Sequence, residues 1–202
     1  MKYDYIIVGA GSAGCVIANR LSEDPSTQVL LIEAGGSDRR FFIQMPIGYG
    51  VTYHQKAVNW MYVTEPSPDA DNKPSYWPRG KVMGGSSSIN AMVYVRGNSR
   101  DFDQWSEAGN PGWSYSDVLP YFKKMESWQK GPDDYRGGDG PLNVSDVSEQ
   151  LHPLCQNFLS AAQEIGIGLN KDMNGATQEG VGNYQITTHK GQRMSSSRAY
   201  LW

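Results

Sequence analysis

Three glycines near the start of the chain have a spacing that suits the close approach of a ligand to the backbone. Gly9, Gly11 and Gly14 form a G-x-G-x-x-G pattern. The pattern directly follows the β-branched run at residues 3–8, and a helical pattern over residues 12–22 begins within it. The first glycine makes a sharp turn, the second lets a pyrophosphate approach, and the third lets helix and strand pack closely. The helix N-terminus offers N–H groups to phosphate. The pattern predicts dinucleotide binding rather than a purely structural turn.

A carboxylate follows the second predicted strand, residues 28–32. Glu33 stands where it can accept hydrogen bonds from both hydroxyls of an adenosine ribose, and it would repel a 2′-phosphate. NAD and FAD both contain this ribose, so the motif leaves both cofactors open. Cys15, just inside the predicted helix, is interpreted as a small packing residue rather than a reactive thiol.

A second glycine turn lies at Gly84 and Gly85 and is followed by three serines, Ile89 and Asn90. Serine there favours the start of a short helix that runs on through residues 89–93. Many backbone N–H groups and small polar side chains gather at this point, which suits an anion or a polar ring system. The alternative is a plain glycine turn that caps a surface helix. A second turn indicates a longer dinucleotide with a flavin at its far end.

With these two turns, the chain resembles the glucose–methanol–choline (GMC) oxidoreductases, in particular their choline-dehydrogenase-like members. The resemblance runs from Tyr3 to the end, through YDYIIVGAGSAGCVIANRLSED, LLIEAGG, NWMYVTEPSP, YWPRGKVMGGSSSINAMVYVRG, NPGWSYSDVLPYFKK and SSSRAYL. The family's first signature covers residues 80–103. Its one departure is Met83, where the pattern prefers a branched aliphatic residue or Trp, and this swap conserves volume.

The resemblance implies noncovalent FAD. Some family members attach the flavin through a His whose matching position here is Ile89. By position, the pyrophosphate of the ADP half would contact Gly9, Gly11, Ser12, Ala13 and Gly14. The adenosine ribose would lie at Glu33, with Ala34 beside it. The flavin half, from its side of the pyrophosphate to the ring and ribityl chain, would contact Val82, Gly84, Gly85, Ser86, Asn90, Ala91, Met92 and Val93.

The implied activity is oxidation of a small-molecule alcohol to an aldehyde or ketone, with hydride transfer to flavin N5 and a base, expected to be His, that removes the hydroxyl proton. His54, His152 and His189 match no catalytic motif of the family, so each is assigned a surface or structural role. We therefore expect no catalytic residue in this chain and place the His and its His or Asn partner in an absent C-terminal part. The alternatives are a lyase on the same FAD scaffold, resembling hydroxynitrile lyases, and a flavin-binding fragment that is inactive alone.

The elements that must position these residues are a strand, the glycine turn, a helix and a second strand, which form a βαβ unit. Further helices are predicted near residues 101–108, 116–127 and 153–165, a strand at 180–187 and a helix start at Ser195. The excursion at residues 35–80 is predicted to be ordered because aromatic residues recur in it. The fold class is α/β: an FAD-binding Rossmann-type βαβ core with irregular insertions and the start of a substrate-binding subdomain. The predicted boundary separates residues 1–154 from an incomplete 155–202.

The composition excludes several other classes. The chain has 202 residues and a net charge of −3, without a basic footprint for nucleic acid. Two cysteines form no disulfide framework, and the predicted location is cytoplasmic. No apolar run approaches the ~18 residues of a membrane span, and neither Asp133 nor Asp134 has a His or Cys at metal-ligand spacing. The residues up to Trp202 are predicted to lie inside a continuing helix, which predicts a companion polypeptide that completes the fold.

Overall fold

The computed structural model describes residues 2–202, which form two compact units of mixed helix and strand. The first unit contains residues 2–92 and 188–202, and the second contains residues 93–187. The first glycine turn, the second glycine turn and the end of the chain therefore belong to one unit. The predicted boundary between an FAD-binding part, residues 1–154, and the start of a substrate-binding subdomain, residues 155–202, stays a prediction.

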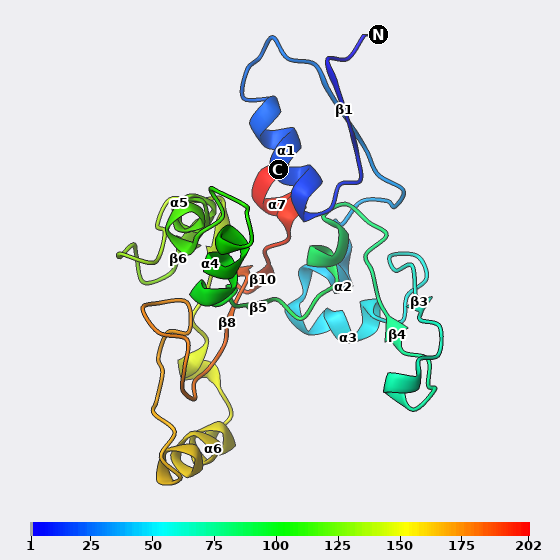
Figure 1. The fold of residues 1–202 in the computed structure, drawn as a ribbon. Coiled ribbons are helices and arrows are strands. Elements are labelled where there is room, and N and C mark those ends of the chain that lie inside the picture. The colour runs from blue at the N-terminus through cyan, green and yellow to red at the C-terminus, as the bar shows by residue number, and fades with distance from the viewer. Residues whose placement is uncertain (1) are drawn as a thin grey trace. The chain divides into compact units, whose positions relative to one another are not determined.

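The βαβ start of the first unit is confirmed (Figure 1). Strand β1 (Tyr5–Val8) leads through the glycine turn into helix α1 (Ser12–Leu21), and strand β2 (Val29–Ile32) follows. The two strands pair in parallel, with Tyr5 opposite Val29 and Val8 opposite Ile32. This parallel register brings the carboxyl ends of both strands to the same edge, where Gly9 and Glu33 follow them.

The burial expected for these two strands is wrong for the described residues. Ile6 is 62% exposed and Val8 is 84% exposed, although both belong to the apolar run that predicted a buried strand. The physical reason is that β1 and β2 pair only with each other within residues 2–202. Apolar runs become fully buried in parallel sheets when strands and helices cover both faces.

The excursion after β2 is ordered, as predicted. It contains helix α2 (Phe41–Gln44), the 3₁₀ turn η1 (Pro46–Gly48), helix α3 (Tyr49–Thr52), the antiparallel pair β3 (Tyr62–Val63) and β4 (Tyr76–Trp77), and the 3₁₀ turn η2 (Pro68–Ala70) between these two strands. A core of Ile43, Val58, Val82 and Ile89 joins it to the second glycine turn.

The second glycine turn opens into a single 3₁₀ turn, η3 (Gly85–Ser88), rather than a helix through residue 93. The correction has a backbone cause, since Met92 has a left-handed φ of 62° that a helix cannot contain. Strand β5 (Val93–Tyr94) then starts the second unit.

The end of the chain returns to the first unit. Strands β9 (Thr188–His189) and β10 (Gln192–Arg193) pair antiparallel, and helix α7 (Ser196–Tyr200) follows at the predicted Ser195 cap. The expected continuation of this helix through Trp202 is wrong, since α7 ends at Tyr200 and Leu201 is its C-cap. Helix α7 lies beside α1 (Figure 1), where Asn19 donates to the Tyr200 carbonyl at 2.9 Å. This contact holds the last residues against the helix that follows the first glycine turn.

The second unit contains helices α4 (Ser99–Glu107), α5 (Tyr115–Met125) and α6 (Pro153–Glu164), and the 3₁₀ turn η4 (Ser148–Gln150). Strands β6 (Glu126–Trp128) and β7 (Leu142–Val144) pair in parallel, and β5 pairs antiparallel with β8 (Gln185–Ile186). The three predicted helices are confirmed. The strand expected at residues 180–187 shrinks to two residues, and residues 126–128, expected to be helical at least in part, form β6. Among the described residues no helix has both the length and the apolar character to cross a bilayer.

A buried charge network holds the second unit together. Glu126 is fully buried and accepts from Arg96 Nη2 at 2.7 Å and from the Arg136 guanidinium. Arg136 also donates to both carboxylate oxygens of Asp172 at 2.8 Å. Each buried charge therefore has an opposite charge in hydrogen-bond contact, which is the condition under which buried charges are tolerated.

Candidate functional site

The first glycine turn leaves the start of α1 open. Gly9 has a left-handed φ of 94°, and its N–H donates to the Ile32 carbonyl at 2.7 Å, which fixes the turn to the end of β2. Gly11 is the N-cap residue of α1, and no side chain caps the helix there. The first N–H groups of a helix have no partner within the helix, so this turn presents unpaired donors and the positive end of the helix dipole.

Gly11 and Gly14 are glycines for different reasons. A Cβ at Gly14 would lie 1.9 Å from the Gly9 carbonyl oxygen, so close packing of helix and strand excludes any side chain there. A Cβ at Gly11 would meet nothing within 4 Å, and its φ of −76° suits any residue. Neither packing nor backbone conformation requires glycine at position 11. Open space at this point fits a ligand whose phosphates approach the backbone.

Glu33 connects the end of β2 to the glycine turn. Its Oε2 accepts from the Ala10 N–H at 2.8 Å, and its Oε1 accepts from the Gly35 N–H at 2.8 Å. A carboxylate has about four acceptor positions, so lone pairs remain for two ribose hydroxyls. The backbone bonds fix the orientation in which Glu33 would meet them.

The second glycine turn packs directly on the first. The Gly84 N–H donates to the Ala10 carbonyl at 2.7 Å, and a Cβ at Gly85 would lie 2.8 Å from the Gly11 Cα. Gly84 and Gly85 both have positive φ, 86° and 56°, which glycine adopts without strain. Two turns far apart in the sequence thus form one continuous backbone surface.

The remaining residues predicted to bind the cofactor belong to both units. Ser86 accepts from the Gly80 N–H at 3.1 Å, and Val93 begins β5 of the second unit and is exposed there. The exposed members in the first unit are Ser12, Ala13, Ala34, Ser86, Asn90 and Ala91. The buried members are Gly14, Val82, Gly84, Gly85 and Met92. Their contacts with a cofactor stay predictions.

Serines at the start of α7 hold the two turns together, and sequence reasoning missed this role. The Ser196 N–H donates to Ser87 Oγ at 2.9 Å, and Ser196 Oγ lies 3.1 Å from Ser12 Oγ. Ser195 and Ser197 both bond the buried carboxylate of Asp38, Ser195 at 3.2 Å. A run of three hydroxyls before a short helix was interpreted only as a helix start, whereas a buried aspartate needs such donors.

A cavity of about 360 Å³ opens beside the second turn. Its lining comes from the turn itself and from the aromatic excursion, with Tyr53, Tyr76, Trp77, Pro78, Arg79, Ser86, Ile89 and Asn90. The lining contains no His, Asp, Glu, Lys or Cys side chain. The cavity can therefore bind a flat or polar group but supplies no proton acceptor of its own.

The three histidines show no catalytic arrangement in the described residues. His54 stacks on Tyr76 with ring centroids 6.0 Å apart, and His152 caps α6, where its Nδ1 accepts from the Leu154 N–H at 3.2 Å. His189 lies in β9. No cluster of three or more His, Cys, Asp or Glu side chains within residues 2–202 has metal-binding geometry.

Cys15 packs against the first turn. Its Sγ donates to the Ala10 carbonyl at 3.2 Å, in a buried cluster with Ala10 and Tyr200. Burial raises the pKa of this thiol to about 11, with smaller contributions from nearby groups. The protonated thiol dominates at neutral pH, so the packing role predicted for Cys15 fits its surroundings.

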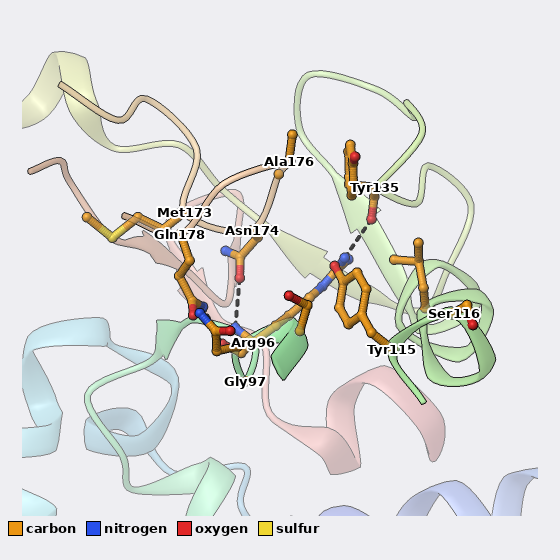
Figure 2. A pocket seen from close by; sticks show the side chains of 13 residues that line it. Arg96, Gly97, Tyr115, Ser116, Tyr135, Met173, Asn174, Ala176 and Gln178 are labelled. Atoms are coloured by element: carbon orange, nitrogen blue, oxygen red, sulfur yellow. Dashed lines mark hydrogen bonds between the residues drawn. The ribbon is translucent and has the colours of Figure 1, made fainter. Parts of the chain in front are cut away.

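The second unit has a cavity of about 380 Å³ of its own. Figure 2 shows Arg96 running along it, with its N–H on Asn174 at 2.7 Å and Nη1 on the Tyr135 carbonyl at 2.5 Å. The lining adds hydroxyls from Tyr115 and Ser116 and apolar atoms from Met173. Arg96 is already paired with Glu126, so this cavity has no free charge with which to select an ion.

Comparison with known proteins agrees with this geometry. A family model described as GMC oxidoreductase matches residues 3–202. The chain is 51% identical over 200 residues to an oxygen-dependent choline dehydrogenase of Photobacterium profundum, covering 98% of this chain and 35% of that protein. It is 50% identical over 200 residues to an alcohol dehydrogenase [acceptor] of Pseudomonas putida, covering 98% of this chain and 36% of that protein.

Among solved structures, pyridoxine 4-oxidase from Mesorbium loti superposes with a TM-score of 0.94 at 34% identity, over 100% of this chain and 40% of that one. The chain thus spans about a third of the length of these curated relatives. The likeness covers both glycine turns and the helix at the end of the chain.

Proposed function

Because the chain belongs to the GMC oxidoreductase family, we propose that its first unit binds FAD for the oxidation of an alcohol to an aldehyde or ketone. The observation that carries the proposal is the open space on the side of Gly11 where a Cβ would lie. Gly85 of the second turn packs against the Gly11 backbone, so both turns border this space. Bound FAD supplies the acceptor for the hydride of the alcohol, at N5. The alcohol is proposed to be primary or small and polar, and the location cytoplasmic.

Each part of the site has one task in this function. The free N–H groups at the start of α1 bind the pyrophosphate, with Gly11 leaving room for it. Glu33, held by two backbone N–H groups, orients the adenosine ribose. The cavity beside Asn90 receives the flavin end and keeps water from it with its aromatic wall.

We propose that the base and the rest of the sheet come from a part of the enzyme outside this chain, a companion polypeptide or a further segment. The exposed face of β1 supports this, since Ile6 and Val8 lie on one apolar face that further elements of a complete parallel sheet would cover. The side chains that line the cavity beside Asn90 include no base, which supports the same division of tasks.

FAD is proposed to be held without a covalent bond. Ile89, which lines the cavity, has no nucleophilic atom. Acid precipitation of the complete protein should release the flavin into the supernatant, and flavin absorbance that stays with the pellet would contradict this. Anaerobic addition of alcohols should then bleach the bound flavin, and a fully loaded protein that no alcohol bleaches would favour a lyase.

Gly11→Ala tests the binding site itself. The added Cβ meets no protein atom, so the variant should fold but bind FAD at least tenfold more weakly in a fluorescence titration of the complete protein. Gly168→Ala, which also adds a Cβ in open space without a positive φ but lies in the second unit, is the matched control. Equal FAD affinity of Gly11→Ala and the wild type would overturn the proposed site.

A further inference from the structure

Arg193 is a fully buried cation at the edge of the second glycine turn. It lies in β10 and is 1% exposed. Its Nε donates to the Ile43 carbonyl at 2.9 Å, and its Nη1 donates to the Ser87 carbonyl at 3.2 Å and to Asn90 Oδ1 at 2.8 Å. The side chain thus joins α2 to the turn that is proposed to hold the flavin half of FAD.

The charge of Arg193 has no counterpart in the described part of the chain. No carboxylate among residues 2–202 forms an ion pair with it, and its buried Nη2 has no hydrogen-bond partner there. Burial lowers the pKa of the guanidinium to about 10, so it still carries its charge at neutral pH. A buried charge is costly unless an opposite charge or a full set of hydrogen bonds compensates it. Such an unmatched cation indicates that a negative group completes its surroundings.

Asn90 connects this cation to the cavity. Its Oδ1 accepts from Arg193 Nη1 and also from the Met92 N–H at 3.1 Å. With the amide oxygen engaged on the protein side, the amide nitrogen is the end left to donate toward the cavity, whose lining includes Asn90. No residue within 2–202 accepts a hydrogen bond from this nitrogen, and the Asn90 side chain is exposed.

We propose that Arg193 is a positioning residue of the cofactor site, which turns the amide nitrogen of Asn90 toward the flavin and favours the form of the cofactor that carries more negative charge. The inference rests on the proposed function. In that reaction the alcohol loses a hydride, two electrons with one hydrogen, to the flavin and loses its hydroxyl proton to a base. The flavin therefore gains negative charge, and an unmatched cation nearby stabilises the reduced form more than the oxidised form.

The test is the midpoint potential of FAD bound to the complete protein, measured by equilibration with a reference dye. Arg193→Met should lower the potential by about 30 mV or more, which for a two-electron couple is a tenfold loss of preference for the reduced form. Arg20→Met is the control, since Arg20 is another cation of the first unit that pairs with Glu23 and bonds neither Arg193 nor Asn90. It should leave the potential unchanged.

Two further variants keep the test decisive if Arg193→Met does not fold. Arg193→Gln keeps an amide donor and removes the charge, and it should lower the potential in the same direction. Asn90→Ala changes an exposed residue and should lower the potential while leaving the melting temperature close to that of the wild type. If Arg193 acts through Asn90, then Arg193→Met should shift the potential less in the Asn90→Ala background than in the wild type.

The outcomes separate this inference from the proposed function. A wild type that binds no FAD, or whose FAD no alcohol reduces, contradicts the proposed function. A wild type that is reduced by an alcohol, with potentials unchanged in the Arg193 and Asn90 variants and only the melting temperatures lowered, overturns the role of Arg193 alone. Arg193→Lys, which retains the charge, should recover most of the potential that Arg193→Met loses.

Discussion

Arg136 of the second unit and Arg193 of the first are both buried, 0% and 1% exposed, but they differ in what surrounds them. Arg136 bonds two carboxylates, those of Glu126 and Asp172. Burial alone would lower the pKa of Arg136, but hydrogen bonds and charge attraction from these carboxylates raise it above its usual value. Arg193 bonds only neutral oxygen atoms, and burial lowers its pKa to about 10.

The comparison shows in which unit the buried arginines are paired with carboxylates of the same unit. In the second unit each buried charge of the network is matched within the unit, so the network serves stability. The first unit has two hydrophobic clusters and the close backbone contact of its glycine turns, while Arg193 and the start of α1 keep positive character without a carboxylate partner. We interpret the first unit as shaped for an anionic cofactor and the second as a self-sufficient support.

The largest expected loss of stability comes from breaking the buried charge network of the second unit. Glu126→Gln should destabilise the protein by about 3–5 kcal/mol, because it leaves Arg96 and Arg136 buried with only Asp172 as a counter-charge. Urea unfolding measures this loss, with the exposed Glu149→Gln as control, expected to stay within about 0.5 kcal/mol. A loss below about 1 kcal/mol would break the comparison, since the network would then add little to stability.

Gly14→Ala should have the next largest effect, since its Cβ would overlap the Gly9 carbonyl oxygen. We expect a loss of about 2–3 kcal/mol in unfolding free energy, the range of an overpacked core. Gly11→Ala should cost no more than about 1 kcal/mol, the difference between glycine and alanine at an N-cap. Equal losses in the two variants would contradict the view that Gly11 serves a ligand and Gly14 serves packing.

Arg193→Met should cost less than Glu126→Gln. The change removes three hydrogen bonds but leaves no carboxylate without a partner, so we expect a loss of about 1–2 kcal/mol. Thermal unfolding of both variants under identical conditions gives the ranking. A loss as large as that of Glu126→Gln would indicate that Arg193 has a counter-charge after all.

The smallest expected effect is on the pH dependence of stability, through the carboxylate of Asp172. Burial alone would raise the pKa of Asp172, but hydrogen bonds from Gln185 and Arg136 prevail and hold it below 3.8. A carboxyl with a lowered folded pKa adds stability above its unfolded pKa, and this is lost as pH falls through the folded value. The melting temperatures of wild type and Asp172→Asn should therefore differ at pH 7, begin to converge once the pH falls below about 3.9, the unfolded value, and become equal only below the lowered folded pKa. A difference that stays constant with pH would contradict the charge role of Asp172.

Local patterns predicted the elements well. The β-branched run before Gly9, the helical spacing after Ser12 and the Pro153 start of α6 each depend on neighbouring residues, and all three are found where expected. The helix expected through residue 93 fails at Met92, which has a left-handed φ and a buried side chain. The predicted burial of β1 is wrong because burial depends on the elements that cover the faces of the sheet, and these are not encoded in the strand itself.

The sequence by itself determined the βαβ start, the two glycine turns and the family, because each depends on residue types at fixed short spacing. Only the tertiary structure decided that Gly85 packs on Gly11, that Ser196 joins both turns, and that Arg193 lies buried without a carboxylate. These contacts join residues 74 to 184 positions apart, where chain spacing no longer restricts position. Packing and the balance of buried charge decide them.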